Sequence, residues 1–500
     1  MIKNIWFVSF CLMLLSYSCI NDDSTLPVHP ISEITIETES DTLNVDYGYE
    51  LVVDPKITQS DENMELKYEW MYHGYKKGGI GGWSPDSLRF LSNEKVLKHT
   101  FKKLGRYGLR LKVTNEHGSS FKKFHLNVIA PYEQGIFVLS ADENKKGRVS
   151  FMRPLNREEQ AAGKEETFYT RAFAAVNPEF PLNDPVDAAK VGPDVFILSG
   201  ADKLVYRVDC RTFQMFNVTD FKKDMDWMQP RYLCSKDRSI VSYLVQSDEG
   251  SFASVDYNSD IAFEGNFFYE EKPIIDKKYS RVLGTPIPPA TSVSSMKVYD
   301  FFLNYENSAV YFIYDLQEWY TRKFEFPEEE LINVGMDKNA VTCVVTRSKT
   351  NPKQIIMHRG QYWKGNPLYN EKYYLYTYEA ENITMDRNSI VQNNDIYNYT
   401  YYTNKNKMYR WVIWNSKPEL PTEPLITLPE DCEITCFEFT ADYKKILLGV
   451  YNPNASGMKG SVYVYDADII DQNTKQLKFY KKYEGVADKP IKIFWKNNRL

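Results

Sequence analysis

Strict alternation of apolar and polar positions is clearest between residues 105 and 129. The apolar positions of the first predicted strand share one face: Tyr107, Leu109, Leu111 and Val113. Residues 115–118 (NEHG) predict a turn, and residues 121–130 return as a second strand. An earlier segment places Tyr68 and Trp70 on one face in the same way. Because a period of two is typical of strands with one side in a core, this region predicts an immunoglobulin-like β-sandwich of about 100 residues.

The pattern changes after residue 135 to strand, polar turn and strand. It recurs seven times, in residues 135–152, 194–209, 239–256, 298–315, 340–359, 396–414 and 445–466. One hairpin in roughly every 52 residues suits the inner strands of four-stranded propeller blades. We therefore predict a seven-bladed β-propeller, and the uneven spacing leaves six or eight blades open. Closure of the ring predicts that residues 490–496 pair beside residues 135–140.

Composition supports an all-β chain with two domains. Aromatic residues make up 15% of the 500 positions, with 37 Tyr, and such residues favour strands. The length exceeds what one ordinary core covers. We expect a sandwich over residues 31–131 and a propeller over residues 135–500.

The N-terminal segment predicts a lipoprotein signal peptide over residues 1–18. Lys3 precedes an apolar stretch, residues 5–15, that is too short to span a bilayer. Small residues before Cys19 resemble a lipobox, the site where a bacterial lipoprotein is acylated and cut, although Leu15 stands four residues before the cysteine and a lipobox has leucine three before it. An ordinary secretory signal cut nearby is the alternative. We expect palmitate or a similar acyl chain on Cys19, followed by a tether over residues 19–30.

Charge separates into regions but does not predict nucleic-acid binding. Removing residues 1–18 takes away Lys3 and no acid, so the net charge of −6 becomes −7. Residues 33–69 carry eleven acids and two bases, whereas residues 89–123 carry ten bases and two acids. The simplest interpretation is that these strands lie side by side, with opposite charges facing each other. A nucleic-acid partner is not expected.

The motifs of the sandwich resemble polycystic-kidney-disease (PKD) domains. Tyr68 and Trp70 match a Y-x-W pattern, and Gly105, Tyr107 and residues 113–118 (VTNEHG) match the later strands. With the signal segment, the junction at residues 135–151 and the closing residues 459–466, the whole chain resembles PKD-like lipoproteins encoded beside starch-utilisation-type (Sus-type) importers of Bacteroidota.

This resemblance implies a location and partners. Asp22 and Asp23 are similar to the acidic tag that sends such lipoproteins to the outer face of the outer membrane. The implied partners are a TonB-dependent transporter and its SusD-like lipoprotein, with the protein anchored by lipid and exposed at the cell surface.

A search for catalytic and metal-binding motifs leads to no site. The chain has no H-E-x-x-H and no G-x-S-x-G motif, and five of its six histidines precede residue 126. His358 is predicted to be an exposed hairpin residue. We expect no cofactor and no metal. Five cysteines remain after Cys11 and Cys19, so at least one thiol is free, and Cys343 is predicted to lie in a buried strand.

Aromatic and arginine residues in turns are the candidate ligand contacts, because aromatic faces suit sugar rings and peptide side chains alike and arginine pairs with carboxylates. The candidates are Trp227 and Arg231 at the start of a blade, Arg359, Tyr362 and Trp363 in a long turn, and Trp83 in a glycine-rich loop. The alternative is that these tryptophans cover the core or decorate a hairpin. The segment 410–414 (RWVIW) is predicted to be a core strand.

Three functions stay open at this stage. The first is a non-enzymatic surface protein that binds nutrient for a TonB-dependent importer, with oligopeptide favoured slightly over oligosaccharide because arginine pairs with carboxylates. The second is a glycosidase or peptidase on a propeller. The third is a purely structural partner of the transporter.

Overall fold

The computed structural model describes residues 31–77, 83–224, 226, 229–235, 242–247, 252–256, 269–270, 280–283, 300–315, 320–337, 341–361, 374–394 and 396–496. The chain forms two compact units, unit 1 (Met1–Ile129) and unit 2 (Ala130–Leu500). Among the described residues, the regular secondary structure is almost all strand, with three short helices, α2 (Arg157–Ala161), α3 (Ala172–Val176) and α4 (Phe221–Asp224). The predicted signal peptide, Cys19 and the tether lie outside the described residues.

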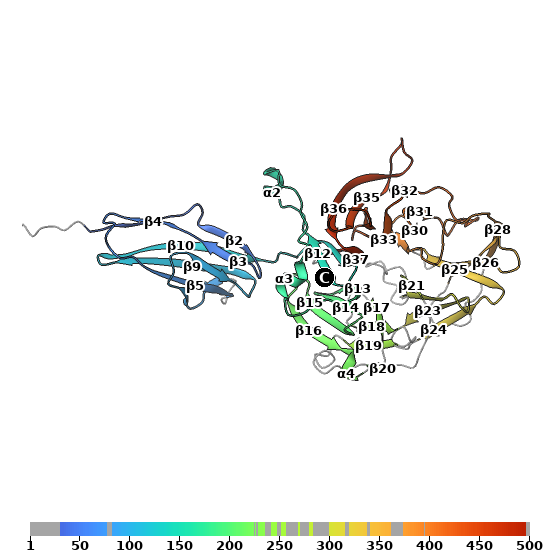
Figure 1. Ribbon diagram of the computed structural model, residues 1–500, viewed down its shortest axis with the longest axis horizontal. Coiled ribbons are helices and arrows are strands. Elements are labelled where there is room, and N and C mark those ends of the chain that lie inside the picture. Colours follow the sequence, from blue (N-terminus) through green and yellow to red (C-terminus); the bar gives the residue numbers. More distant parts are fainter. Residues whose placement is uncertain are drawn as a thin grey trace, which may run out of the picture. The chain divides into compact units, whose positions relative to one another are not determined.

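Unit 1 is an Ig-like β-sandwich (Figure 1). Its large sheet has the order β2 (Thr42–Asp46), β10 (Gly118–Ile129), β9 (Gly105–Asn115), β5 (Lys67–Lys77) and β6 (Trp83–Pro85), and β7 (Arg89–Ser92) also pairs with β5. Two small sheets complete it: β1 (Ile34–Glu37) with β4 (Lys56–Gln59), and β3 (Glu50–Val53) with β8 (Leu97–Thr100).

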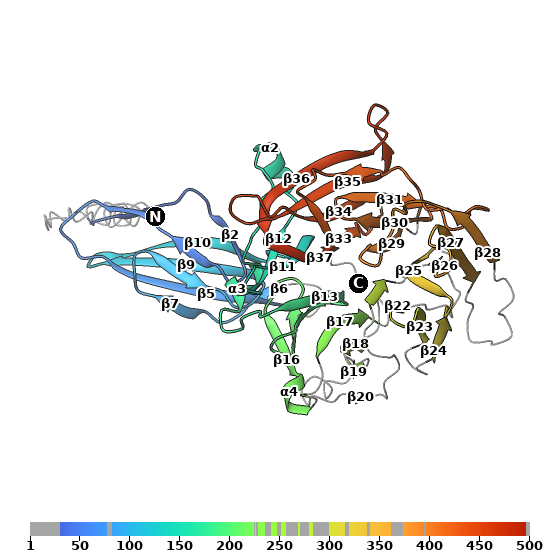
Figure 2. The same ribbon diagram turned by 45° about the vertical axis from the view of Figure 1, so that its right-hand side comes forward.

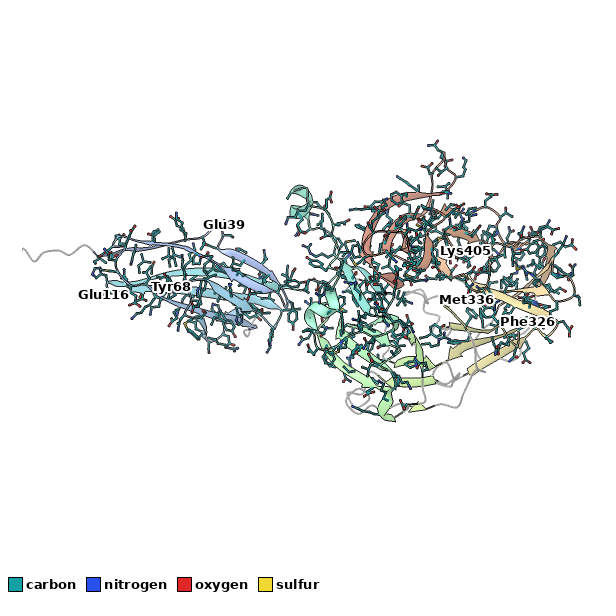
Figure 3. All side chains as sticks on the ribbon, viewed as in Figure 1. Glu39, Tyr68, Glu116, Phe326, Met336 and Lys405 are labelled. Atoms are coloured by element: carbon teal, nitrogen blue, oxygen red, sulfur yellow. The ribbon has the colours of Figure 1, made fainter. Side chains whose placement is uncertain are left out.

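The predicted hairpin of the sandwich is confirmed. Asn115 of β9 pairs with Gly118 of β10, and Leu111 and Val113 are fully buried. Trp70 of β5 is also fully buried; its indole N–H donates to the Glu94 carbonyl at 3.0 Å. Tyr68, labelled in Figure 3, is only half-buried. Alternation along the strands thus places the core where the sequence pattern indicates.

Unit 2 is a β-propeller. Six four-stranded sheets lie among the described residues, and each consists of four consecutive strands. The first three sheets are β13 (Pro185–Val191), β14 (Asp194–Ser199), β15 (Leu204–Asp209) and β16 (Met215–Asp220); β17 (Pro230–Ser235), β18 (Ser242–Ser247), β19 (Phe252–Asp256) and β20 (Tyr269–Glu270); and β21 (Ser280–Leu283), β22 (Asp300–Asn304), β23 (Ala309–Asp315) and β24 (Tyr320–Glu325). The other three are β25 (Glu329–Met336), β26 (Val341–Ser348), β27 (Gln354–Gln361) and β28 (Tyr374–Glu379); β29 (Val391–Asn394), β30 (Tyr399–Asn404), β31 (Lys407–Trp411) and β32 (Ile426–Thr427); and β33 (Glu433–Phe439), β34 (Lys445–Tyr451), β35 (Gly460–Ile470) and β36 (Leu477–Ala487). A three-stranded sheet has the order β12 (Gly147–Met152), β11 (Gly135–Ala141), β37 (Lys489–Lys496).

Each predicted hairpin of unit 2 is present as two antiparallel, paired strands. In the four-stranded sheets it forms the middle pair, as β14 with β15 or β34 with β35, and in the three-stranded sheet it is β11 with β12. The described residues of unit 2 therefore contain seven sheets. The blade number of the whole chain stays a prediction.

Ring closure is confirmed at the strand level. β37 pairs antiparallel with β11, from Gly135 opposite Lys496 to Ala141 opposite Lys489, and β11, β12 and β37 lie together in Figure 2. Phe137 of β11 stacks on Phe494 of β37 with ring centroids 4.5 Å apart. The last described strand therefore joins the first strand of unit 2 and leaves no open sheet edge between them.

Buried polar side chains link neighbouring blades. Asp187 of β13 accepts a hydrogen bond from the Leu233 backbone of β17 at 2.9 Å, and Lys492 of β37 lies 3.7 Å from the same carboxylate. Thr400 of β30 donates to the carbonyl of Met336, labelled in Figure 3, at the end of β25. Because buried polar groups need partners, these contacts hold together the blades that they join.

The prediction for residues 410–414 was half right. Trp411 of β31 is buried and packs over Gly335, where an added Cβ would lie 2.6 Å from the indole ring. The prediction that Trp414 is a core residue was wrong, because β31 ends at Trp411 and Trp414 is 53% exposed. A turn follows the strand and breaks the alternation.

Candidate binding groove and the predicted site residues

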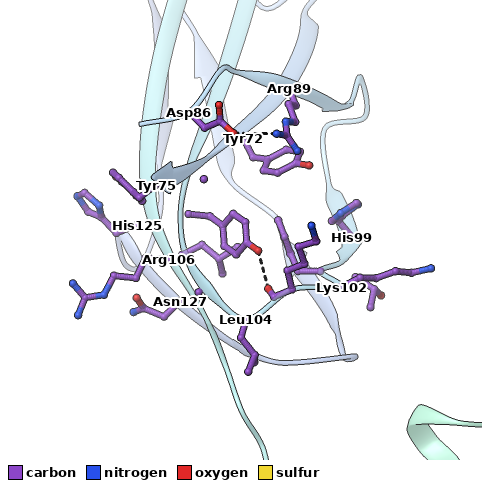
Figure 4. Close-up of a pocket in the computed structure, with 17 residues that line it drawn as sticks. Tyr72, Tyr75, Asp86, Arg89, His99, Lys102, Leu104, Arg106, His125 and Asn127 are labelled. Carbon is purple, nitrogen blue, oxygen red and sulfur yellow. Dashed lines mark hydrogen bonds and ion pairs between the residues drawn. The ribbon is translucent and has the colours of Figure 1, made fainter. Parts of the chain in front are cut away.

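A groove of about 1120 Å³ opens on unit 1 (Figure 4). It lies at the end of the sandwich where β9 begins and β10 ends, and the loop 101–104 between β8 and β9 forms one side. Its lining comes from five strands and the loops that join them. The side chains that carry its chemistry are Tyr72, Tyr75, Asp86, Arg89, His99, Phe101, Lys102, Lys103, Arg106, Tyr107 and His125.

Aromatic rings form the inner part of the groove. Phe101 is buried and lies between Tyr72 and Tyr107, with ring centroids 5.7 and 5.0 Å away. His99 packs against the same phenyl ring at 4.7 Å. The Tyr107 hydroxyl donates to the Lys103 carbonyl at 2.7 Å, which ties the loop to β9. Burial raises the pKa of Tyr107 and lowers that of His99.

Cations surround these rings. Arg89, Lys102, Lys103 and Arg106 are all exposed, and Asp86 is the one carboxylate among the lining residues. The charged side chains that line the groove are therefore mainly positive, while the sequence as a whole is acidic.

Arg89 is held in position at the groove. Its Nη2 donates to Asp86 Oδ2 at 3.0 Å, and its guanidinium carbon lies 5.9 Å from the centroid of Tyr72. Asp86 is fixed in turn, because its backbone N–H donates to the Gly74 carbonyl at 2.7 Å. The Arg89 side chain nevertheless stays 60% exposed, so its guanidinium can reach a ligand.

Sequence reasoning missed this groove, although a signal for it was present. The excess of bases over residues 89–123 was assigned to pairing across the sheet. That interpretation holds for Lys112, which lies opposite Glu69, and for Lys122, which forms a 2.7 Å ion pair with Asp41. It does not hold for Lys102 and Lys103, because the loop that carries them turns to the groove.

Several of the sequence-predicted site residues cannot be placed. Cys19, Trp227, Tyr362 and Trp363 lie outside the described residues. Trp83 begins β6, opposite Lys77 of β5. Their roles stay predictions.

The two arginines predicted to contact ligand lie in different blades. Arg231 is exposed and is the extra residue of a β-bulge in β17, because Pro230 pairs with Ser247 and Tyr232 with the adjacent Gln246. Arg359 of β27 instead reaches the next blade: its Nη1 donates to the carbonyls of Ile413, at 3.1 Å, and Asn415.

His358 is not an exposed hairpin residue, and that prediction was wrong. It lies within β27, and its side chain is only 7% exposed. Its Nε2 is 2.5 Å from Glu329 Oε2 and 3.1 Å from Thr346 Oγ1. Because both partners face the same ring nitrogen, the histidine is not placed to relay a proton between them, as a Ser–His–Asp triad does. It links β27 to Thr346 of β26 and to Glu329 of β25.

Replacing Glu329 with glutamine should cost unit 2 about 1–2 kcal/mol of unfolding free energy near neutral pH. Burial raises the pKa of Glu329, but hydrogen bonds from His358 and Thr346 outweigh it and hold the pKa below the usual value. The wild-type advantage should therefore be full above about pH 5 and fall as the pH drops below about 4. Urea unfolding of both proteins between pH 3 and 7 measures the difference. A difference that does not change with pH would contradict the charged hydrogen bond.

Four cysteines are buried among the described residues: Cys210, Cys343, Cys432 and Cys436. Cys343 lies in β26, as predicted, and burial raises its pKa. Within the same residues, no three His, Cys, Asp or Glu side chains are grouped so that they could hold a metal ion. No helix of this described part is long and apolar enough to cross a membrane.

Comparison with known proteins identifies the N-terminal region. The model of the PKD-like family matches residues 19–176. The N-terminal region is thus PKD-like, and a propeller follows it. No curated protein matches the chain.

Solved structures resemble the chain at low identity. A quinonprotein alcohol dehydrogenase-like protein from Bacteroides thetaiotaomicron is 12% identical, with a TM-score of 0.47 over 91% of this chain and 96% of that one. A proposed 6-phosphogluconolactonase from Bacteroides fragilis is 11% identical, with a TM-score of 0.45 over 74% and 99%. AztD from Citrobacter koseri is 10% identical, with a TM-score of 0.41 over 73% and 99%. These likenesses carry no argument about activity, and the fold described above rests on the strand pairing.

Proposed function

We propose that this protein is a lipid-anchored binding protein of the outer membrane that faces the cell exterior and holds nutrient without cleaving it. In this proposal Cys19 carries the acyl chains. The protein serves a TonB-dependent transporter and its SusD-like lipoprotein as an accessory subunit. The sequence resemblance to PKD-like lipoproteins beside Sus-type importers supports the setting, and the groove supports the binding.

The observation that carries the proposal is the combination of volume, rings and cations in unit 1. A groove of about 1120 Å³ is larger than a drug-sized ligand needs and suits an oligomer. Rings at its inner part supply apolar contact, and exposed Lys102, Lys103 and Arg106 supply charge at its rim. This arrangement favours binding of a ligand that is partly apolar and partly anionic.

Retention of nutrient by the mature protein tests the proposal. Purified protein is incubated with a mixture of oligopeptides and with a mixture of oligosaccharides, and bound and unbound fractions are identified by mass spectrometry. We expect retained, intact oligopeptides. The double variant Lys102→Glu, Lys103→Glu should weaken retention about tenfold or more, because it reverses two charges at the rim.

A matched control separates the groove from net charge. Lys67→Glu with Lys123→Glu makes the same charge change at exposed positions of unit 1 that do not line the groove, and it should leave retention unchanged. Ligand cleaved by the wild type would support the surface enzyme. If no ligand is retained, the purely structural partner is supported. Equal loss in both double variants would contradict a role for the groove.

The anchor and the partners are tested in the cell. Labelling with radioactive palmitate should mark the wild type and not Cys19→Ser, and the wild type should copurify from outer membranes with a TonB-dependent transporter. Unlabelled wild-type protein would contradict the lipid anchor.

A further inference from the structure

We propose that the groove of unit 1 recognises the C-terminal carboxylate of an oligopeptide whose last side chain is apolar. The inference rests on the proposed function, because it names the ligand of the same groove. Two parts of the groove carry it: the aromatic rings and the positioned guanidinium of Arg89.

The rings are arranged to take an inserted side chain. Phe101 and Tyr72 meet at 85°, and Tyr107 is tilted against them at 43° and 55°. A sugar ring needs an open aromatic face to stack on, and Phe101 is only 4% exposed. Tyr72 and Tyr107 are half-buried and keep part of their rings accessible at their edges to a ligand side chain. The ring cluster therefore fits an apolar side chain better than a sugar.

Arg89 lies beside the same rings and suits a carboxylate. Its guanidinium carbon is 5.9 Å from the centroid of Tyr72, so a carboxylate on it would stand next to a side chain inserted among the rings. A guanidinium offers donors in a planar fork that matches carboxylate geometry. Asp86 accepts a hydrogen bond from Nη2 of Arg89 and so orients the guanidinium before a ligand binds.

Asp86 also repels an anion, and the remaining cations offset this repulsion. Lys102, Lys103 and Arg106 line the same groove as exposed positive charges. With Arg89 they outnumber the carboxylate four to one. Every linear peptide chain carries one such α-carboxylate, so cutting a protein into oligopeptides multiplies the number of ends that the groove can bind.

A pair of peptides that differ only at the C-terminus tests the inference. The probe is the hexapeptide Gly-Ser-Gly-Ser-Ala-Phe as the free acid, with its C-terminal amide as the comparison and a hexamer of galacturonic acid as a glycan arm. Isothermal titration calorimetry with the full mature protein should give a Kd for the free acid about 10- to 100-fold lower than that for the amide. Arg89→Gln should raise the Kd of the free acid to that of the amide.

Two variants keep the test specific. Arg89→Lys should recover part of the preference, because it keeps the charge and loses the fork. Lys123→Gln removes one exposed charge outside the groove and should leave both Kd values unchanged. Hydrogen exchange of β5 and β9 shows whether each variant keeps the fold.

The outcomes separate this inference from the proposed function. Equal binding of acid and amide would overturn carboxylate recognition and leave a peptide-binding groove. Tighter binding of the galacturonic acid hexamer would overturn the peptide assignment and leave an anion-binding groove. If none of the three probes binds, both the inference and the groove as a nutrient site fail.

Discussion

Replacing Lys496 with methionine lowers the free energy of unfolding of unit 2 by about 2–4 kcal/mol in our account. Lys496 is fully buried, and its ammonium donates to the backbone carbonyls of Tyr132, Glu133 and Cys210. Methionine fills a similar space and leaves three carbonyls without this donor. Part of this loss of unfolding free energy is offset, because methionine also removes the cost of burying a charged ammonium. That cost is visible in the pKa of Lys496, which burial lowers to about 8.

The loss of stability should be concentrated in the sheet that closes the ring. Hydrogen exchange followed by mass spectrometry should show faster exchange in β37 and β11, together with a lower urea midpoint. Lys489→Met is the matched control on the same strand: Lys489 is half exposed and pairs with Glu433 at the surface, so its loss should change stability by less than about 1 kcal/mol. If Lys496→Met unfolds at the wild-type urea midpoint, the hydrogen bonds of the Lys496 ammonium do not stabilise the ring.

Replacing Trp70 with alanine should destabilise unit 1 by about 3–5 kcal/mol. The indole is fully buried, lies 5.7 Å from the stacked ring of Phe124, and donates to the Glu94 carbonyl. Alanine would leave a cavity in the sandwich and an unpaired carbonyl. Hydrogen exchange in β5, β9 and β10 should rise by two to three orders of magnitude, while β37 is unaffected.

An exposed tryptophan supplies the control for this change. Trp414 is 53% exposed, and Trp414→Ala should cost less than about 1 kcal/mol. If Trp70→Ala keeps the wild-type exchange of β9, the indole is not the centre of the sandwich core.

Most of the fold could be predicted because strands and the turns between them produce recognisable patterns of apolar and polar residues. Each hairpin of unit 2 joins consecutive strands, so its two apolar runs and the turn between them are adjacent in the chain. The pairing of β37 with β11 joins residues far apart, yet a closed ring requires it, and this requirement predicted it. Leu111 and Val113 were located by period alone.

The misses have physical causes of their own. His358 was predicted to be an exposed hairpin residue, but β27 continues to Gln361 and the imidazole is buried. Trp414 looked buried because the alternation runs one turn past the end of β31. Both errors came from misplacing the end of a strand, and strand ends are only weakly marked in the sequence.

The groove could not be predicted because its residues are not adjacent in the chain. Tyr72, Arg89, Phe101 and Tyr107 come from β5, β7, the loop 101–104 and β9, and only the pairing of these strands brings them together. The basic run over residues 89–123 marked the region. The sequence pattern could not separate the lysines that pair across the sheet from those that face the groove.

Recovery of a bound peptide over time tests most directly the claim that this protein holds its ligand and does not transform it. The mature wild-type protein is mixed with the free-acid hexapeptide in slight excess, and intact masses of free and bound peptide are followed for a day. Our account predicts a saturable bound fraction that is released unchanged when the protein is denatured. Steady loss of the hexapeptide with the appearance of shorter products, at a rate proportional to protein concentration, would contradict it.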